Sequence, residues 1–232
     1  MQHRGYPCND GRVSFTGNAV ARPPALIRDQ VAAQIREAIT NLELMPGQVL
    51  SERELCEATT ASRATVREAL RQLQTEGLIV STNGRGSAVA RLSADAARQI
   101  YEVRSQLEGL AGRLFAERAD DADKRALRMA LIHVEEAFDD NRRLVKAKTA
   151  FYEALVAGGG NAELKQLLEM INRRVTSVRA VSLSKPGRPE ESVAEVRAIC
   201  EAAVSGDADL AEKLCRQHVE NAAAAALPQL GD

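Results

Sequence analysis

The chain of 232 residues lacks any apolar run long enough to cross a bilayer, and its first residues lack the apolar stretch of a secretory signal peptide. It also lacks a phosphate-binding loop, a nucleophile elbow and a pair of carboxylates at catalytic spacing. We therefore expect a cytoplasmic protein that has no membrane partner and is not an enzyme.

Cysteine is scarce, with four residues at positions 8, 56, 200 and 215, and no two of them form a C-x-x-C motif. Reduced thiols are therefore favoured over disulfides or a zinc site. A redox-sensing pair of Cys200 and Cys215 is a less favoured alternative.

The chain also has little net charge, −1, but its basic residues are locally concentrated. Residues 24–91 hold eight basic and eight acidic side chains, yet four arginines lie between positions 62 and 86 against two glutamates. Focused charge of this kind favours a specific nucleic-acid site over indiscriminate coating of DNA. Residues 1–23, which contain several glycines and prolines, are predicted to form a flexible N-terminal tail.

The segment 50–91 predicts two short helices followed by a hairpin. Ser51 and Ser62 are expected to cap helices that run to about Ala58 and to Glu76. The second helix buries a face of apolar residues at three- and four-residue spacing, namely Val66, Ala69, Leu70 and Leu73. Asn83-Gly84 then supplies a tight hairpin turn, and a preceding helix over 25–44 with apolar positions at Leu26, Val31, Ile35, Ile39 and Leu42 completes the domain.

This order is typical of a winged helix-turn-helix, which binds DNA. The N-terminal end of the second helix enters the major groove, where guanidinium groups pair with guanine while hydroxyls hold phosphates. Arg63 and Arg67 are four residues apart and so project from one helix face, which also carries Thr65 and Arg71. An arginine-bearing surface helix alone would be an ordinary solvated helix, but the preceding helix and the wing make that alternative unlikely.

The strings SEREL and SRATVREALRQLQTEGL resemble the GntR family of bacterial transcription regulators, over residues 26–91. The resemblance implies operator contacts from Arg53, Ser62, Arg63, Thr65 and Arg67, with Asn83, Gly84 and Arg85 of the wing near the minor groove. The family's usual turn is Leu-Gly-Val before Ser-Arg, whereas this chain has Thr59, Thr60 and Ala61. A left-handed conformation at the β-branched Thr60 would be strained.

Residues 92–232 show no strand pattern and predict an all-α bundle of six helices, over 94–119, 122–139, 142–157, 162–183, 190–205 and 208–227. Two apolar stripes are expected to face its core: Val103, Leu107, Leu110 and Leu114, and Leu164, Leu167, Leu168, Ile171, Val175 and Val178. The fold class is thus mainly α, with a tail over 1–23, a winged helix-turn-helix over 24–91 and a bundle over 92–232.

The bundle resembles the effector-binding and dimerising FCD domain of the FadR subfamily, in its shorter VanR-like branch, through strings such as YEVR, LEGLA and PGR. Many members hold a divalent metal with an aspartate and three histidines. At the matching positions this chain has Lys148, Tyr152 and Val196, and only His218 is a ligand type. One histidine beside an ammonium is a poor transition-metal site, so we predict no metal and no other cofactor.

Lys148 is expected to replace the missing cation. With Arg104, Tyr152 and His218, and with Val196 in the same pocket, it would bind an acidic effector directly. Alternatively Lys148 extends to solvent and the pocket is apolar or vestigial. The expected function is a homodimeric repressor that binds double-stranded operator DNA and responds to a small acidic metabolite. The alternatives are a ligand-insensitive DNA-binding protein with a decayed pocket and a metal-dependent sensor.

Overall fold

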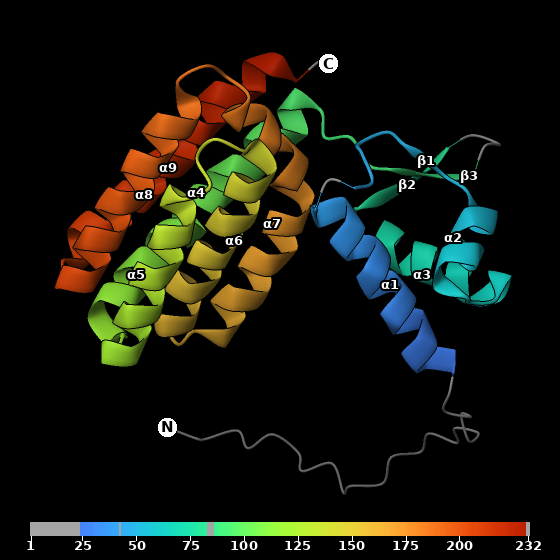
Figure 1. Ribbon diagram of the computed structural model, residues 1–232, viewed down its shortest axis with the longest axis horizontal. Coiled ribbons are helices and arrows are strands. Elements are labelled where there is room, and N and C mark those ends of the chain that lie inside the picture. The colour runs from blue at the N-terminus through green and yellow to red at the C-terminus, as the bar shows by residue number, and fades with distance from the viewer. Residues whose placement is uncertain (1–23, 42, 83–85, 231–232) are drawn as a thin grey trace, which may run out of the picture.

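The computed structural model describes residues 24–41, 43–82 and 86–230, which form a small N-terminal domain and a larger helical bundle (Figure 1). The predicted fold class, a winged helix-turn-helix followed by an all-helical bundle, is confirmed. The N-terminal elements are α1 (Pro24–Thr40), β1 (Val49–Leu50), α2 (Glu52–Thr59), α3 (Arg63–Thr75), β2 (Ile79–Thr82) and β3 (Gly86–Val89). The three strands are antiparallel in the order β1-β3-β2, with Val49 opposite Ala88 and Ile79 opposite Val89.

Side-chain caps set the beginnings of α2 and α3, as expected from the sequence. The Ser51 hydroxyl accepts from the Glu54 amide at 3.3 Å, and the Ser62 hydroxyl accepts from the Thr65 amide at 3.2 Å. Thr60, between the two helices, has φ 54° and ψ 22°, so the turn does hold a β-branched residue in the left-handed conformation. Glycine fits that conformation at low cost, and a β-branched residue does not.

The core of the N-terminal domain lies between α1 and α3. Its buried residues include Val31, Ile35 and Ile39 of α1 and the four predicted apolar residues of α3. The expected contribution of Leu26 to this face is wrong, because its side chain is 69% exposed near the beginning of α1. Leu42 lies outside the described residues.

The bundle contains the six predicted helices: α4 (Ala94–Arg118), α5 (Asp121–Glu135), α6 (Asn141–Gly158), α7 (Ala162–Leu183), α8 (Arg188–Ser205) and α9 (Ala208–Ala226), followed by the short 3-10 turn Leu227–Gln229. Asp140 caps α6, not Asn141, and accepts from the amides of Arg142 and Arg143. Helix α8 begins two residues earlier than expected, because Pro189 fits the first turn of a helix, where its missing N–H is not needed.

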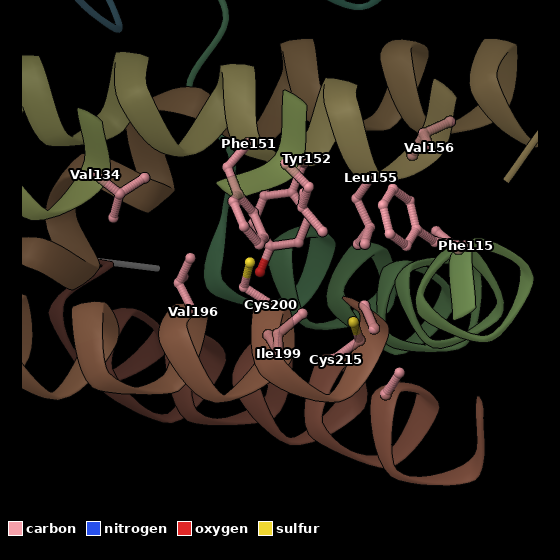
Figure 2. Packing of buried hydrophobic residues seen from close by; sticks show 14 of the residues in the cluster. Phe115, Val134, Phe151, Tyr152, Leu155, Val156, Val196, Ile199, Cys200 and Cys215 are labelled. Carbon is pink, nitrogen blue, oxygen red and sulfur yellow. The ribbon is translucent and has the colours of Figure 1, made fainter. Parts of the chain in front are cut away.

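Helix α4 is the central element of the bundle, since it contacts α6, α7, α8 and α9. Helices α6 and α8 face each other across the main apolar core. Figure 2 shows side chains from α6 pointing toward side chains from α8: Phe151, Tyr152 and Leu155 from the first and Val196, Ile199 and Cys200 from the second. Cys200 and Cys215 are free, buried thiols, and burial raises the pKa of Cys200 to about 11, which disfavours the reactive thiolate.

The predicted inward face of α4 is half correct: Leu114 is buried and Leu107 packs against the main core, but Val103 and Leu110 do not face inward. Val103 and Leu110 are 53% and 38% exposed, while Tyr101, Arg104 and Glu108 are buried. The actual inward face is therefore partly polar. On α7 the predicted stripe is buried except for Leu167, which is 46% exposed.

Helix α7 also lies at the junction between the two parts of the molecule, beside α1 (Figure 1). Within the described part of the chain, no helix is long and apolar enough to cross a membrane.

Candidate functional site

The exposed face of α3, its cap and the first turn of α2 carry the predicted DNA-contacting side chains. Arg53, Ser62, Arg63, Arg67 and Arg71 are exposed, as an interface requires. Thr65 is half-buried, and its hydroxyl lies 2.8 Å from that of Ser62. The wing residues Asn83, Gly84 and Arg85 lie outside the described residues, so their role stays a prediction.

Ion pairs distinguish the arginines of this face. Arg67 pairs with Glu52 of α2 at 2.9 Å, Arg71 with Glu68 at 2.6 Å and Arg53 with Glu57 at 3.2 Å. Among the described residues, no carboxylate lies within 4.0 Å of Arg63. Arg63 stands at the first position of α3, where the helix amides and the helix dipole also favour an anion. Arg63 is therefore the side chain most available to an incoming phosphate or base.

Inside the bundle, Lys148, Tyr152, Val196 and His218 come together with Arg104, as expected, and all five are buried. The Lys148 Nζ donates to Ser192 Oγ at 2.5 Å and lies 3.0 Å from His218 Nε2. On its other side, His218 Nδ1 lies 2.5 Å from Glu195 Oε2. With Nδ1–H donating to this carboxylate, Nε2 is left as the acceptor for Lys148. The alternative in which Lys148 extends to solvent is therefore wrong.

Burial and charge shift the pKa values of this group. Burial, helped by the positive charge of Lys148, lowers the pKa of His218 to about 3. Burial acts to raise the pKa of Glu195, but hydrogen bonds from His218 and Arg188 outweigh it and lower the pKa to about 2. The pKa of Lys148 is held well below its ordinary value, first by burial and then by the charges of neighbouring arginines. The amine thus acts as a hydrogen-bond donor whose charge is disfavoured.

A second polar group lies beside the first, and it combines predicted and unpredicted residues. Arg104 donates from Nε to Glu108 Oε1 at 2.8 Å, and its guanidinium lies 5.2 Å from the centre of the Tyr101 ring. Arg179 of α7 lies 6.0 Å from the centre of the Tyr152 ring. Several buried atoms of this group have no hydrogen-bond partner, namely Tyr101 Oη, Tyr152 Oη, Arg104 Nη1, Arg179 Nη2 and Glu108 Oε2.

A cavity of about 290 Å³ opens between α6 and α7, next to this polar group. Tyr152 and Arg179 line it, together with Arg173, Thr176 and Thr40, the last residue of α1. Of the five predicted effector residues, Tyr152 alone lines the cavity. Sequence reasoning missed Arg179, although its position four residues after the buried Val175 places it on the inward face of α7.

The residues present do not fit a divalent transition metal. His218 Nε2 faces Lys148 at 3.0 Å, and Glu195 is already bound by Arg188 and Asn221. Within the described ranges, no group of three or more histidine, cysteine, aspartate or glutamate side chains is placed to hold a metal ion. Such an ion requires several converging donors of these types.

Acid should destabilise the protein through His218. Its pKa is about 3 in the folded chain and near 6.5 when unfolded, so the unfolded chain binds the extra proton as the pH falls below 6.5. The contribution of His218 to the free energy of unfolding should therefore fall from pH 6.5 to 4.5, by at most about 1.4 kcal/mol per pH unit. Protonation of Glu195 lowers the free energy of unfolding further only below about pH 4.5.

Urea unfolding at several pH values measures this slope. His218→Gln should flatten it, while His133→Gln, at an exposed histidine on α5, should leave it unchanged. If both variants and the unchanged protein showed the same slope, His218 would not be the source of the pH dependence.

Comparison with known proteins supports the arrangement of both domains. Residues 27–89 match the model of the bacterial regulatory proteins of the gntR family, and residues 99–221 match the FCD domain. The chain is 32% identical over 202 residues to the "Probable D-xylose utilization operon transcriptional repressor" of Paenarthrobacter nicotinovorans, covering 84% of this chain and 88% of the relative. It is 30% identical over 171 residues to the HTH-type transcriptional regulator YdhC of Bacillus subtilis (strain 168), covering 72% and 76%.

Comparison with solved structures gives the same result as comparison with these relatives. A GntR-type transcriptional regulator from Rhodococcus sp. RHA1 is similar with a TM-score of 0.75 and 25% identity, covering 88% of this chain and 99% of that one. McbR/YncC of E. coli shares the fold, with a TM-score of 0.77 at 19% identity, over 88% and 98% of the two chains. These relatives are transcriptional regulators rather than enzymes, in agreement with the expectation from the sequence. The chain therefore belongs to the GntR family of bacterial transcriptional regulators, with a helix-turn-helix DNA-binding domain followed by an FCD domain.

Proposed function

We propose that this regulator is a homodimeric repressor that binds a pseudo-palindromic operator in the cytoplasm and is controlled by a small acidic metabolite bound without a metal. Named repressors among its relatives support the direction of control, including NanR of Citrobacter rodentium, which is 26% identical over 219 residues. Two copies would place two α3 helices in successive major grooves. The exposed Val103 and Leu110 of α4 support a surface for the second copy.

The observation that carries the metal-free proposal is the position of Lys148. Its Nζ is held by Ser192 and His218, at the place where the resemblance to metal-binding relatives would put an ion. The surrounding interior holds the guanidinium groups of Arg104, Arg179 and Arg188 against the carboxylates of Glu108 and Glu195. An excess of buried positive charge and donors favours an anionic ligand. The hydroxyl of Tyr152 would supply a further donor.

The cavity also supports control of the DNA-binding domain. Arg173 and Thr176 line the cavity and a second crevice at the domain junction, which Gly77 and Leu78 line from the other side. Hydrogen bonding from Arg36 lowers the pKa of Glu76, at the end of α3, and the charge of Arg173 adds to this shift. A ligand that moves Arg173 would therefore change the contacts of the recognition helix. The coupling free energy cannot exceed the difference in the ligand's affinity for the two arrangements of the DNA-binding domains, with Arg173 moved and unmoved.

Two alternatives are less well supported. A ligand-insensitive regulator would need no cavity bordered by buried, unpartnered donors. A metal-dependent sensor would need a donor set that Lys148 interrupts.

The test combines metal analysis with thermal unfolding in the presence of small organic acids, amino acids and acyl-CoA thioesters. We expect no stoichiometric metal in the purified protein, a raised Tm with at least one acid, and roughly 10- to 150-fold weaker affinity for that acid in Lys148→Ala. The matched control is Lys146→Ala, which removes an exposed lysine from the same helix. A stoichiometric ion, or an unchanged affinity in Lys148→Ala, would contradict the metal-free proposal.

A further inference from the structure

Arg179 is a buried cation without a counterion. Its side chain comes from α7 and is 5% exposed, and among the described residues no carboxylate lies within 4.0 Å of it. One guanidinium nitrogen donates to Thr149 Oγ1 at 3.2 Å, and Nη2 has no partner. A buried guanidinium is ordinarily paired with a carboxylate or another anion, because an uncompensated charge is costly away from water.

Neither neighbouring carboxylate is paired with Arg179, although the charge of Glu108 partly offsets its burial. Glu108 is bound by Arg104, at 2.7 Å from its Nη2, and Glu195 is bound by Arg188, also at 2.7 Å. With these two pairs matched, one guanidinium is left over. Burial lowers the pKa of Arg179 and the charge of Arg104 lowers it further, so the two cations disfavour each other. An anion next to Arg179 would relieve both effects.

Space for that anion lies on the cavity side of Arg179. Arg179 and Tyr152 both line the 290 Å³ cavity, but the Tyr152 hydroxyl points toward Cys200 of α8 (Figure 2). The opposite part of the lining is electrically balanced: Glu169 lies 3.3 Å from Arg173 and 4.0 Å from Lys165, and Glu153 adds a further carboxylate. The cavity thus has one unbalanced cation at its inner wall and no excess of positive charge elsewhere.

We propose that Arg179 binds the carboxylate of the effector, and that the effector is a small monocarboxylate with an uncharged body. This assignment rests on the proposed function, narrows its ligand class and moves the carboxylate contact from Lys148, which does not line the cavity, to Arg179. A planar guanidinium suits a carboxylate because both present two parallel atoms for hydrogen bonding. A second carboxylate would meet Glu153 and Glu169, and the volume is too small for an acyl-CoA thioester.

The test compares the full-length protein with Arg179→Met, using thermal unfolding without and with acetate, lactate, benzoate and succinate. Without added acid, Arg179→Met should unfold at a Tm equal to or above that of the unchanged protein, because it removes an uncompensated buried charge. The monocarboxylate that raises the Tm of the unchanged protein should bind roughly 10- to 150-fold more weakly to Arg179→Met. Arg125→Met, which removes an exposed arginine of α5 that does not line the cavity, is the matched control and should keep the response.

The outcomes separate this assignment from the proposed function. A lower Tm of Arg179→Met without acid would show a structural role and overturn the assignment, and so would an undiminished response to the monocarboxylate. Arg179→Gln, a second variant, keeps a polar side chain and guards against misfolding of Arg179→Met. If succinate or an acyl-CoA thioester alone raises the Tm, the proposal of an acid-responsive regulator is retained and the assignment of a monocarboxylate ligand is wrong. If no acid raises the Tm of the unchanged protein, both the proposed acid response and the monocarboxylate assignment are wrong.

Discussion

Replacing Arg63 by alanine is expected to weaken operator binding by about 1–3 kcal/mol per half-site, and by about twice that for a dimer on two half-sites. Arg63 is exposed at the first turn of α3 and, among the described residues, has no carboxylate within 4.0 Å. Its guanidinium therefore gives up no internal ion pair on binding DNA. Binding is measured by fluorescence anisotropy at one fixed salt concentration on an operator selected from genomic fragments, since salt alone changes such affinities by orders of magnitude.

Arg67→Ala should have a smaller effect than Arg63→Ala. Arg67 is already paired with Glu52 at 2.9 Å and must exchange that partner for DNA. Arg125→Ala is the control, because it removes an exposed arginine from α5, on the far side of the bundle from α3 (Figure 1). Affinity unchanged in the double variant Arg63→Ala/Arg67→Ala, with the fold intact by circular dichroism, would contradict the assignment of α3 as the recognition helix.

Local chemistry explains why so much of the fold was predictable. Asn161 caps α7 and Gly160 precedes it with a positive φ, so the predicted helix of residues 162–183 coincides with the observed one. In α3, the Ser62 cap marks the beginning of the helix, and the spacing of its buried residues identifies its inward face. A helix cap and the spacing of buried residues each involve residues only a few positions apart in the chain, so both can be recognised from the sequence.

The interior of the bundle was less predictable, because burial there depends on partners from distant parts of the chain. The apolar spacing of Val103 and Leu110 is correct for a helix, yet α4 turns Arg104 and Glu108 inward instead. These two residues are four apart and neutralise each other, which makes their burial possible. Arg179 was missed for a similar reason, since its neighbours Thr149 and Tyr152 come from another helix. Periodicity locates a helix face, and only the assembled helices show which polar groups that face can bury.

The largest expected effect on stability is the removal of the charge of Glu108. Its side chain is 1% exposed, and its Oε1 accepts a hydrogen bond from Arg104 Nε at 2.8 Å and lies 2.7 Å from Arg104 Nη2. Burial acts to lower the pKa of Arg104, but the charge and hydrogen bond of Glu108, together with the nearby Tyr101 and Tyr152, outweigh burial and raise it. In Glu108→Gln, Arg104 loses its ion-pair partner, and the unpaired Arg179 loses the nearby negative charge that partly offsets its burial. Breaking a buried pair in this way costs about 3–5 kcal/mol.

Urea unfolding at pH 7 measures this loss, and Glu102→Gln is the matched control because it removes an exposed glutamate from the same helix. A loss below about 1 kcal/mol in Glu108→Gln would show that the interior tolerates the unpaired arginines. The double variant Arg104→Met/Glu108→Leu removes both charges together and should recover most of the stability, because apolar replacement of a buried ion pair is often close to neutral. A double variant as unstable as Glu108→Gln would place the loss in packing around α4 rather than in uncompensated charge.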